Sequence, residues 1–144
     1  MESVFVGRLL FGRVISALLD ANDKAAAPLG LTGRQGMVLA NVARGEATTA
    51  IELAAYNGLD ISSMSRMLDR LERKKLLQRT RSHLDRRKVV VRLTPKGHAL
   101  LRKAIPVAAH ATTNAWKGVT EREKKTLRTI VHKILRNTGH LQKS

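Results

Sequence analysis

The segment RTRSHLDRRKVVVRLTPKG, residues 79–97, constrains the fold more than any other part of the chain. Apolar Val89, Val91 and Leu93 alternate with other residues, and a polar turn at 83–87 separates them from the preceding LLQRTRS. This pattern predicts a short β-hairpin. The segment also carries seven Lys or Arg residues against a single acid, Asp85, so the predicted hairpin is strongly basic.

Helical patterns precede and follow the hairpin. We expect a first helix over residues 4–24, with an apolar face, and five further helices that begin after capping signals. These signals are Thr32 with Gln35, Thr49 with Glu52, Asp60, Thr94 with Pro95, and Thr120 with Glu123. The helix that begins at Pro95 should run toward Trp116 and bend near Pro106. Four helices, a basic hairpin and two further helices predict a winged helix-turn-helix, a mainly α fold with one small β-hairpin.

The charge of the chain points to a polyanionic partner. The formal net charge is +16, and residues 62–96 hold twelve Lys or Arg against three acids, a surplus of nine. Charge concentrated in this way is typical of proteins that bind nucleic acid. Cysteine is absent, which excludes disulfides, thiolate metal sites and thiol redox sensing, and the five histidines show no paired ligand spacing. We therefore expect no metal and no cofactor.

Other classes of protein fit the sequence poorly. Charged residues interrupt every long apolar stretch, so we expect no membrane span, and without an export signal we expect a cytoplasmic protein. The residues suggest no nucleophile with a base and an orienting group, no Gly-flanked serine elbow and no phosphate-binding GxxxxGK[ST] loop. An enzyme is not expected.

Three separated stretches resemble the MarR (multiple antibiotic resistance regulator) family of bacterial transcription factors. The wing pattern D-x-R-x-x-x-V-x-L-T-x-x-G is present from Asp85 to Gly97, and LTGRQGMVLANVARG and MSRMLDRLERKKLLQR resemble the second helix and the recognition helix of that family. The resemblance implies dimerisation helices at 1–30 and 98–144 around a winged helix-turn-helix at 31–97. It also implies a homodimer on a pseudo-palindromic operator in double-stranded DNA, commonly a repressor released by a small aromatic or phenolic ligand.

One position departs from the family pattern. Lys75 follows the recognition helix where the family usually has Gly. If the backbone there is left-handed, Lys carries a steric cost that Gly avoids.

The recognition helix supplies the first set of candidate DNA contacts. Hydroxyl and guanidinium groups share the face opposite its methionine and leucine residues. Ser62, Ser63, Ser65 and Arg66 are candidates to read bases or bind phosphate, and Arg70 and Arg73 are candidates for backbone contacts. The alternative is a solvated face with ion pairs inside the helix.

The wing supplies the second set. We expect Arg87, together with Arg86, to enter the minor groove, and Asp85 to orient an arginine. Arg79, Arg81 and Lys88 complete the basic wing, with Arg79 and Arg81 beside phosphate. The alternative is that these charges only keep an edge strand soluble.

Two weaker sets remain. Thr32, Arg34, Thr48 and Thr49 are candidates for phosphate contacts from helix starts, although simple capping is an equal alternative. Arg13, His110 and Trp116 are candidates for an effector pocket, with ordinary surface or interface roles as the alternative.

The sequence thus predicts a sequence-specific DNA-binding regulator, and the family resemblance implies that it responds to a ligand. Two rivals remain open at this stage. One is a less selective nucleoid or RNA-binding protein, because a charge of +16 attracts any phosphate backbone. The other is a small-molecule binding protein that kept the fold and lost DNA binding.

Overall fold

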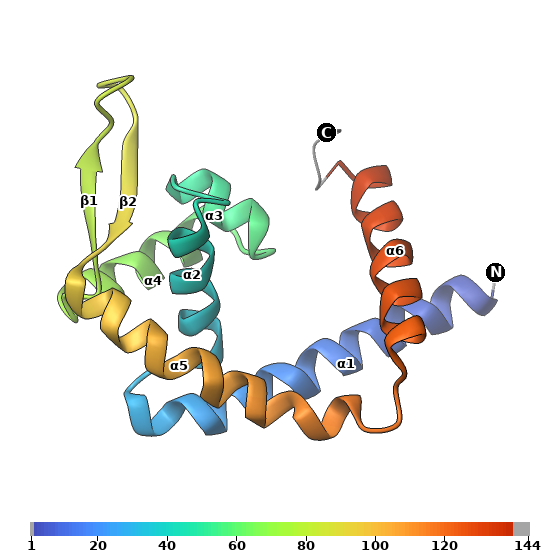
Figure 1. Ribbon diagram of the computed structural model, residues 1–144. Coiled ribbons are helices and arrows are strands. Elements are labelled where there is room, and N and C mark those ends of the chain that lie inside the picture. The colour runs from blue at the N-terminus through green and yellow to red at the C-terminus, as the bar shows by residue number, and fades with distance from the viewer. Residues whose placement is uncertain (1, 140–144) are drawn as a thin grey trace.

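The computed structural model describes residues 2–139 and contains six α-helices and one two-stranded sheet within that range. The elements are α1 (Glu2–Ala26), η1 (Ala27–Leu29), α2 (Gly33–Arg44), α3 (Ala50–Tyr56), α4 (Ile61–Arg73), β1 (Leu77–Arg81), β2 (Val89–Leu93), α5 (Pro95–Thr113), η2 (Asn114–Trp116) and α6 (Glu121–Asn137). This order confirms the predicted mainly helical fold with one hairpin. Figure 1 shows the hairpin projecting beside α2 and α4 at one end of the molecule, and α6 standing at the other.

The predicted helix starts lie where the capping signals place them. Complete capping boxes begin α2, α3 and α6, the Asp60 carboxylate caps α4, and the Thr94 hydroxyl caps α5 with Pro95 in its first turn. The first helix is longer than the predicted range 4–24. It continues to Ala26 and passes directly into η1, which contains Pro28, because proline is compatible with the first turn of a new helical segment. Helix α5 is continuous through Pro106.

The core lies between α2, α3, α4 and the base of the hairpin. Its largest fully buried side chains are Val38, Leu39, Leu53, Met64, Leu68, Leu71, Leu76 and Leu77. The strands pair antiparallel with Leu77 opposite Leu93, and the Val91 N–H donates to the Thr48 carbonyl, which joins β2 to the segment before α3. The hairpin is therefore fixed at its base by both its core leucines and a backbone hydrogen bond.

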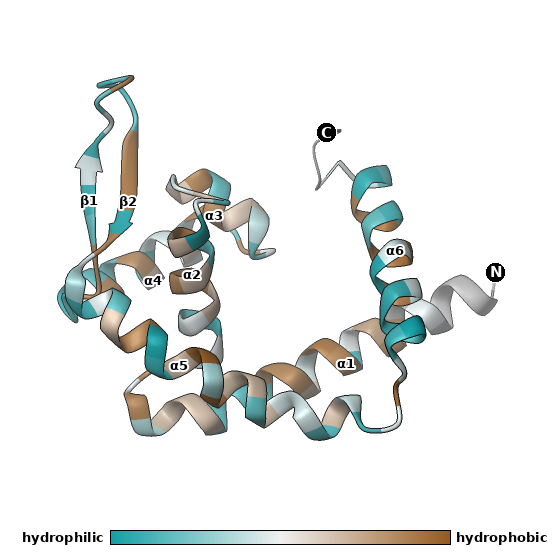
Figure 2. Cartoon of the chain, viewed as in Figure 1, coloured by the Kyte–Doolittle hydropathy of each residue, from teal (hydrophilic) through white to brown (hydrophobic). Residues whose placement is uncertain are grey.

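Helices α1 and α5 pack against each other and against α2. In Figure 1 they form a long layer beneath the winged helix, and Figure 2 shows brown apolar residues alternating with polar ones along α1. Helix α6 follows η2 and has no buried residue in the described part of the chain. No helix in residues 2–139 is long and apolar enough to cross a membrane.

Candidate nucleic-acid interface

Helix α4 begins with a polar network on its outer face. The Ser63 N–H donates to Asp60 Oδ1 over 2.8 Å, and Arg66 Nη2 donates to Ser63 Oγ over 3.1 Å. The hydroxyl of Ser63, followed by its N–H, lowers the pKa of the Asp60 carboxyl. The network orients the Arg66 guanidinium alongside the first turn of the helix.

The rest of α4 separates a buried face from a polar one. Met64, Leu68 and Leu71 are fully buried, whereas the predicted contacts Ser62, Arg66, Arg70 and Arg73 are exposed and Ser63 and Ser65 are half-buried. Arg73 Nε donates to the Asp69 carbonyl over 3.4 Å. The candidate side chains of α4 thus lie along one accessible surface, which the helical period of 3.6 residues predicts.

The tip of the wing is a hydrogen-bonded turn. Ser82 N–H donates to the Lys88 carbonyl over 2.8 Å, and Lys88 N–H donates to the Asp85 carbonyl over 2.9 Å. Asp85 Oδ1 accepts from the Arg87 N–H over 3.0 Å, and no ion pair of Asp85 occurs within residues 2–139. The expectation that Asp85 orients an arginine therefore takes a different form. The carboxylate holds the backbone at Arg87, because an Asp side chain readily bonds an N–H two residues ahead.

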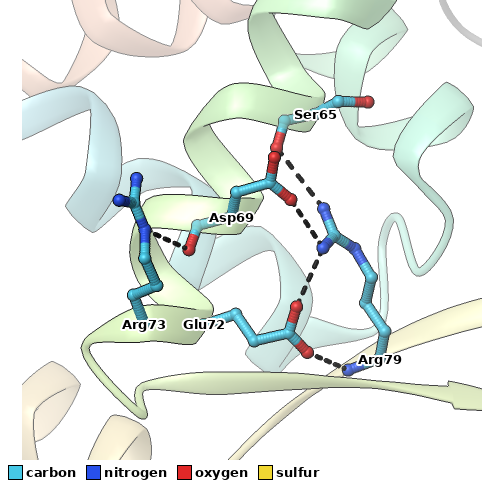
Figure 3. Close-up of polar contacts among 5 residues, drawn as sticks. All are labelled: Ser65, Asp69, Glu72, Arg73 and Arg79. Atoms are coloured by element: carbon cyan, nitrogen blue, oxygen red, sulfur yellow. Dashed lines mark hydrogen bonds and ion pairs between the residues drawn. The ribbon is translucent and has the colours of Figure 1, made fainter.

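Arg79 has a role that the sequence did not suggest. Figure 3 shows its guanidinium directed at α4, where Nη1 lies 2.7 Å from Asp69 Oδ1 and 2.8 Å from Glu72 Oε2. Nη2 donates to the Ser65 carbonyl over 3.4 Å, and the Arg79 N–H donates to Glu72 Oε1 over 3.0 Å. These four contacts join β1 to the recognition helix. The guanidinium expected beside phosphate is already paired with two carboxylates of the same chain.

The other wing bases are free of such pairing. Arg81, Arg86, Arg87 and Lys88 are exposed, and none forms an ion pair with a described residue. Their charge is consequently available to an external anion, unlike the charge of Arg79.

The junction between α4 and β1 explains the departure at Lys75. Lys75 has φ +59°, a left-handed conformation, and its N–H donates to the Glu72 carbonyl while the Leu76 N–H donates to the Leu71 carbonyl. This pair of bonds is a Schellman motif, which usually has Gly at the left-handed position. A Gly at this position would adopt the conformation freely, whereas Lys75 adopts it at a steric cost.

The start of α5 closes the same junction. Thr94 Oγ1 donates to the Lys75 carbonyl over 2.7 Å and accepts from the Gly97 N–H over 3.0 Å, and the Thr94 N–H donates to the Leu76 carbonyl over 3.1 Å. A Cβ at Gly97 would overlap the Leu76 carbonyl oxygen. The Thr94 and Gly97 positions of the wing pattern thus allow α5 to approach the end of the recognition helix closely.

The hydroxyl groups expected at helix starts take part in capping. Thr32 Oγ1 accepts from the Gln35 N–H, Thr49 Oγ1 accepts from the Glu52 N–H, and the N–H groups of Thr48 and Thr49 donate to Glu52 Oε2. Those backbone bonds, from Thr48 first and then Thr49, lower the pKa of the Glu52 carboxyl. Arg34 is half-buried on the first turn of α2. Phosphate contacts from this set remain a prediction.

The three candidate effector residues lie apart in the described chain. Arg13 lines a surface hollow with residues of α1 alone, Trp116 lines a hollow with Ile15, Asn22 and Met37, and His110 is exposed. Positions 13 and 15 are about 200° apart on a helix, which places them on opposite sides of α1. Residue type alone indicated these three positions, whereas the packing of α1 places Ile15 beside Trp116 and Arg13 on the other side of the helix.

An apolar cavity of about 120 Å³ lies where α1, α2 and α5 meet, adjoining the Trp116 hollow through Asn22 and Met37. Small residues make room for it: Ala26, Gly33, Gly36, Ala40, Ala104 and Ala108. Asn22 Oδ1 is buried there and accepts no hydrogen bond from a described group. In the sequence, this cavity is indicated by the small residues that recur along α2 and α5. Within residues 2–139 no cluster of His, Asp or Glu side chains could hold a metal ion.

Comparison with known proteins identifies the family. The model of the MarR family matches residues 29–88. Over 129 residues the chain is 30% identical to the multiple antibiotic resistance protein MarR of Salmonella typhimurium, covering 86% of this chain and 90% of that protein. The chain belongs to the MarR family. The match to the transcriptional repressor MprA of Escherichia coli, also 30% identical, spans about half of that protein, 52%.

Solved structures share the fold over most of both chains. CouR from Rhodococcus jostii RHA1, bound to p-coumaroyl-CoA, superposes with a TM-score of 0.80 at 29% identity, covering 87% of this chain and 88% of CouR. A cysteine-to-serine mutant of Escherichia coli MarR complexed with operator DNA gives a TM-score of 0.77 at 29% identity, covering 93% of this chain and 96% of that one. The winged helix, α1 and α5 are therefore those of a MarR-family regulator.

Proposed function

We propose that this MarR-family protein is a sequence-specific, double-stranded DNA-binding transcriptional regulator that acts as a homodimer. It represses by occupying a pseudo-palindromic operator and is released by a small effector. The observation that carries the proposal is the accessible basic surface formed by α4 and the wing, whose arginines at 66, 70, 73, 81, 86 and 87 pair with no acid among the described residues.

The two parts of this surface suit two grooves. Ser62, Ser65 and Arg66 lie in the first turns of α4, where a recognition helix contacts base edges in the major groove. Arg86 and Arg87 lie at the tip of a projecting hairpin, where narrow minor grooves concentrate negative potential. Arg79 joins the wing to α4 and so holds the two parts of the surface in a fixed relation. It also neutralises Asp69 and Glu72, which would otherwise repel phosphate. The MarR structure with operator DNA is a precedent for the fold.

The dimer is supported by apolar faces that the single chain leaves uncovered. On α1 the side chains of Phe11, Val14 and Ile15 are 44–57% exposed, and on α6 those of Ile130 and Ile134 are 47% and 44% exposed. A helix of this length derives most of its stability from packing, so α6 needs a surface to bury its stripe. A second copy provides one, with α1 and α6 of each chain covering the other.

The effector site is the apolar cavity between α1, α2 and α5. Its volume of about 120 Å³ is close to that of engineered cavities of about 150 Å³ that bind benzene. A ligand hydroxyl that donates to the buried Asn22 Oδ1 would satisfy the unpaired oxygen. A single aromatic ring with a hydroxyl group fits both properties, and the adjoining Trp116 hollow offers room for a substituent. Occupation would alter the packing of α1 and α5 against α2 and so the spacing of the recognition helices.

We assign the chain a non-catalytic role and a cytoplasmic location, where a regulator meets bacterial DNA. The relative MprA of Escherichia coli is named as a transcriptional repressor, which supports the first assignment.

A selection experiment tests the proposal. The full chain is incubated with a pool of random duplexes, and the enriched duplex is compared with random duplex at equal salt. We expect the enriched duplex to contain an inverted repeat and to bind at least about 10³-fold more tightly. Equal affinity for both duplexes would favour a nucleoid protein, tighter binding of RNA would favour an RNA-binding protein, and either result would overturn the proposal.

A further inference from the structure

The wing tip carries one apolar side chain among charged and polar ones. In the turn at 82–88 this residue is Leu84, and its side chain is 101% exposed. The other large apolar side chains that the structure describes as exposed lie between 38% and 67%. Single exposed apolar residues are common on protein surfaces, so exposure alone indicates nothing. Leu84 is distinguished by its place at the end of a basic hairpin that projects from the molecule (Figure 1).

Hydrogen bonds hold the backbone around Leu84. Ser82 Oγ accepts from the Leu84 N–H over 3.2 Å and from the Asp85 N–H over 3.3 Å. The backbone bonds of Lys88 with Ser82 and Asp85 close the turn around them. Leu84 belongs neither to the core nor to the apolar residues packed against it. Its backbone is therefore ordered before any ligand binds, which lowers the entropic cost of binding, and its side chain has no packing role in the described chain.

Unpaired positive charges lie next to Leu84. Arg86 and Arg87 are exposed and form no ion pair within residues 2–139. Two residues span at most about 7 Å when extended, so the backbone at Leu84 stays close to that at Arg86. Proteins that bind the minor groove frequently combine arginines with an apolar side chain such as Leu. The wing tip presents this combination on one short turn.

Base pairs differ in what they present to such a tip. In the minor groove an A·T pair shows only acceptors, whereas a G·C pair adds the guanine N2 amino group, which is a donor. Arginine has donors and no acceptor, and leucine has neither. Asp85, the one acid of the turn, accepts from the Arg87 N–H. A guanine amino group covered by Leu84 and the arginines would therefore lose water without gaining an acceptor, at a cost in binding free energy.

We propose that Leu84 enters the minor groove beside Arg86 and Arg87 and makes the wing select A·T over G·C pairs. The proposal rests on the proposed function, in which the wing tip meets the minor groove. The arginines bond the acceptors of A·T pairs, and Leu84 covers the neighbouring base edges and excludes the guanine amino group. Leu84 is thus a specificity-determining residue that contacts DNA without contacting phosphate.

A protein partner fits the wing tip less well. A stable protein interface buries about 800 Å² on each side and has a centre depleted of charged residues. At the tip one leucine lies among four exposed basic or polar side chains, those of His83, Arg86, Arg87 and Lys88. A protein bound there would desolvate several bases for one apolar contact, whereas a narrow minor groove attracts the bases and receives the leucine with them.

The test varies the base pairs under the wing tip and leaves the rest of the site unaltered. Hydroxyl-radical footprinting of the full chain on the enriched duplex locates the outermost protected minor groove, and the few base pairs there are made A·T, G·C or inosine·C in both half-sites. Inosine lacks the N2 amino group of guanine, so an inosine·C pair resembles A·T in the minor groove and G·C in the major groove. We expect the unmodified protein, followed by fluorescence anisotropy, to bind the A·T and inosine·C duplexes about equally and the G·C duplex about tenfold more weakly.

Substitution of Leu84 separates its contribution from that of the arginines. Leu84→Gln supplies an amide oxygen that accepts from the guanine amino group, so the tenfold penalty for G·C should fall to about threefold or less. Leu84→Met stays apolar and should keep the full penalty. Neither variant removes a charge, so the slope of log affinity against log salt should stay unchanged in both. Val89→Thr is the matched control, because Val89 is also exposed on the wing, at 49%, and this variant should keep the G·C penalty.

Three results would overturn the proposal. An unchanged G·C penalty in Leu84→Gln would assign the A·T preference to the arginines alone. Equal effects of Leu84→Gln and Val89→Thr would show that the penalty does not depend on the position of Leu84. An inosine·C duplex that the unmodified protein binds as weakly as G·C would place the discrimination in the major groove.

Two further measurements keep the result interpretable. Urea denaturation should give both Leu84 variants the stability of the unmodified protein, since the side chain is fully exposed. Light scattering should show an unchanged oligomeric state, and a changed state would assign Leu84 to a contact between chains and overturn the proposal. If the unmodified protein binds enriched and random duplexes equally, the proposed function fails, whereas the affinities of the Leu84 variants for duplexes made only of A·T, inosine·C or G·C pairs still test the role of Leu84.

Discussion

The sequence places Arg79 beside DNA phosphate, whereas the structure pairs it with Asp69 and Glu72, and a substitution at this position distinguishes the two roles. Arg79→Gln removes a guanidinium that lies 2.7 Å from Asp69 and 2.8 Å from Glu72 and whose side chain is 28% exposed. The carboxylates are themselves 54% and 39% exposed, so water screens the pairs. Each should therefore contribute toward the upper end of the range for surface pairs, about 0.5–1 kcal/mol. We expect the variant to lose about 1–2 kcal/mol of unfolding free energy in urea denaturation.

The same substitution should weaken binding to the enriched duplex. Without Arg79 the wing is no longer held to α4, and the two carboxylates on the recognition helix are left unneutralised. If about 1.4 kcal/mol of positioning is lost in the complex, affinity falls about tenfold. Conversely, a guanidinium that bonds phosphate directly would release a counterion, and its removal from both copies of the homodimer would lower the salt slope by about 1.8. Because Arg79 is paired inside the chain, we expect a lower affinity with an unchanged slope.

Fluorescence anisotropy over a range of salt distinguishes the two roles. Arg81→Gln is the matched control, since Arg81 lies two residues along the same strand, is exposed and has no ion pair in the described chain. The control removes one such contact from each copy and should lower the slope by about 1.8 without loss of stability. A slope that falls equally in both variants, together with an unchanged stability of Arg79→Gln, would refute the positioning role.

Four further substitutions or truncations test other parts of the structure. Lys75→Gly should raise the unfolding free energy by about 1 kcal/mol because Gly tolerates φ > 0, whereas the control Lys75→Ala should bring no such gain. A Gly variant that is less stable than the unmodified protein would contradict the left-handed backbone conformation at residue 75. Arg87→Ala should weaken operator binding and flatten its A·T preference in the outer minor groove, and unchanged binding would remove the wing from the interface. A chain truncated after Thr120 should sediment as a monomer with poor DNA binding, and a dimer of full affinity would refute the role of α6. The pKa of the Glu52 carboxyl is lowered in the folded state, so its stabilising effect is present above the unfolded-state pKa and is lost as the pH falls through the folded-state pKa. The difference in unfolding free energy between the unmodified protein and Glu52→Gln, measured by urea denaturation, should therefore be largest near neutral pH and shrink below about pH 4.

Local patterns predicted most of the fold because they depend on residues close together in the chain. A capping box joins positions three residues apart, so Thr32, Thr49 and Thr120 indicate helix starts without reference to the rest of the molecule. The alternation of Val89, Val91 and Leu93 likewise predicted β2, whose Val91 and Leu93 are buried. The end of α1 was less well predicted, because η1 extends the helical path past the residue where the pattern stops.

The candidate site was predicted only in outline. Charge spacing indicated which residues of α4 and the wing face outward, and the accessible positions of Arg66, Arg70 and Arg87 agree with it. The pairing of Arg79 was missed because an arginine in a basic hairpin looks the same whether it faces phosphate or carboxylate. Asp69 and Glu72 lie on another element, and only the angle between β1 and α4 brings them within hydrogen-bonding distance.

The sequence by itself determined the order of helices, their caps, the basic hairpin and the outward face of the recognition helix, because each depends on local spacing or on the residue type alone. The tertiary structure decided which charges remain available to DNA, why Lys75 is left-handed and where small residues of α2 and α5 leave a cavity beside Asn22. These properties depend on how elements distant in sequence pack together. Packing sets distances and angles between side chains that no local pattern contains.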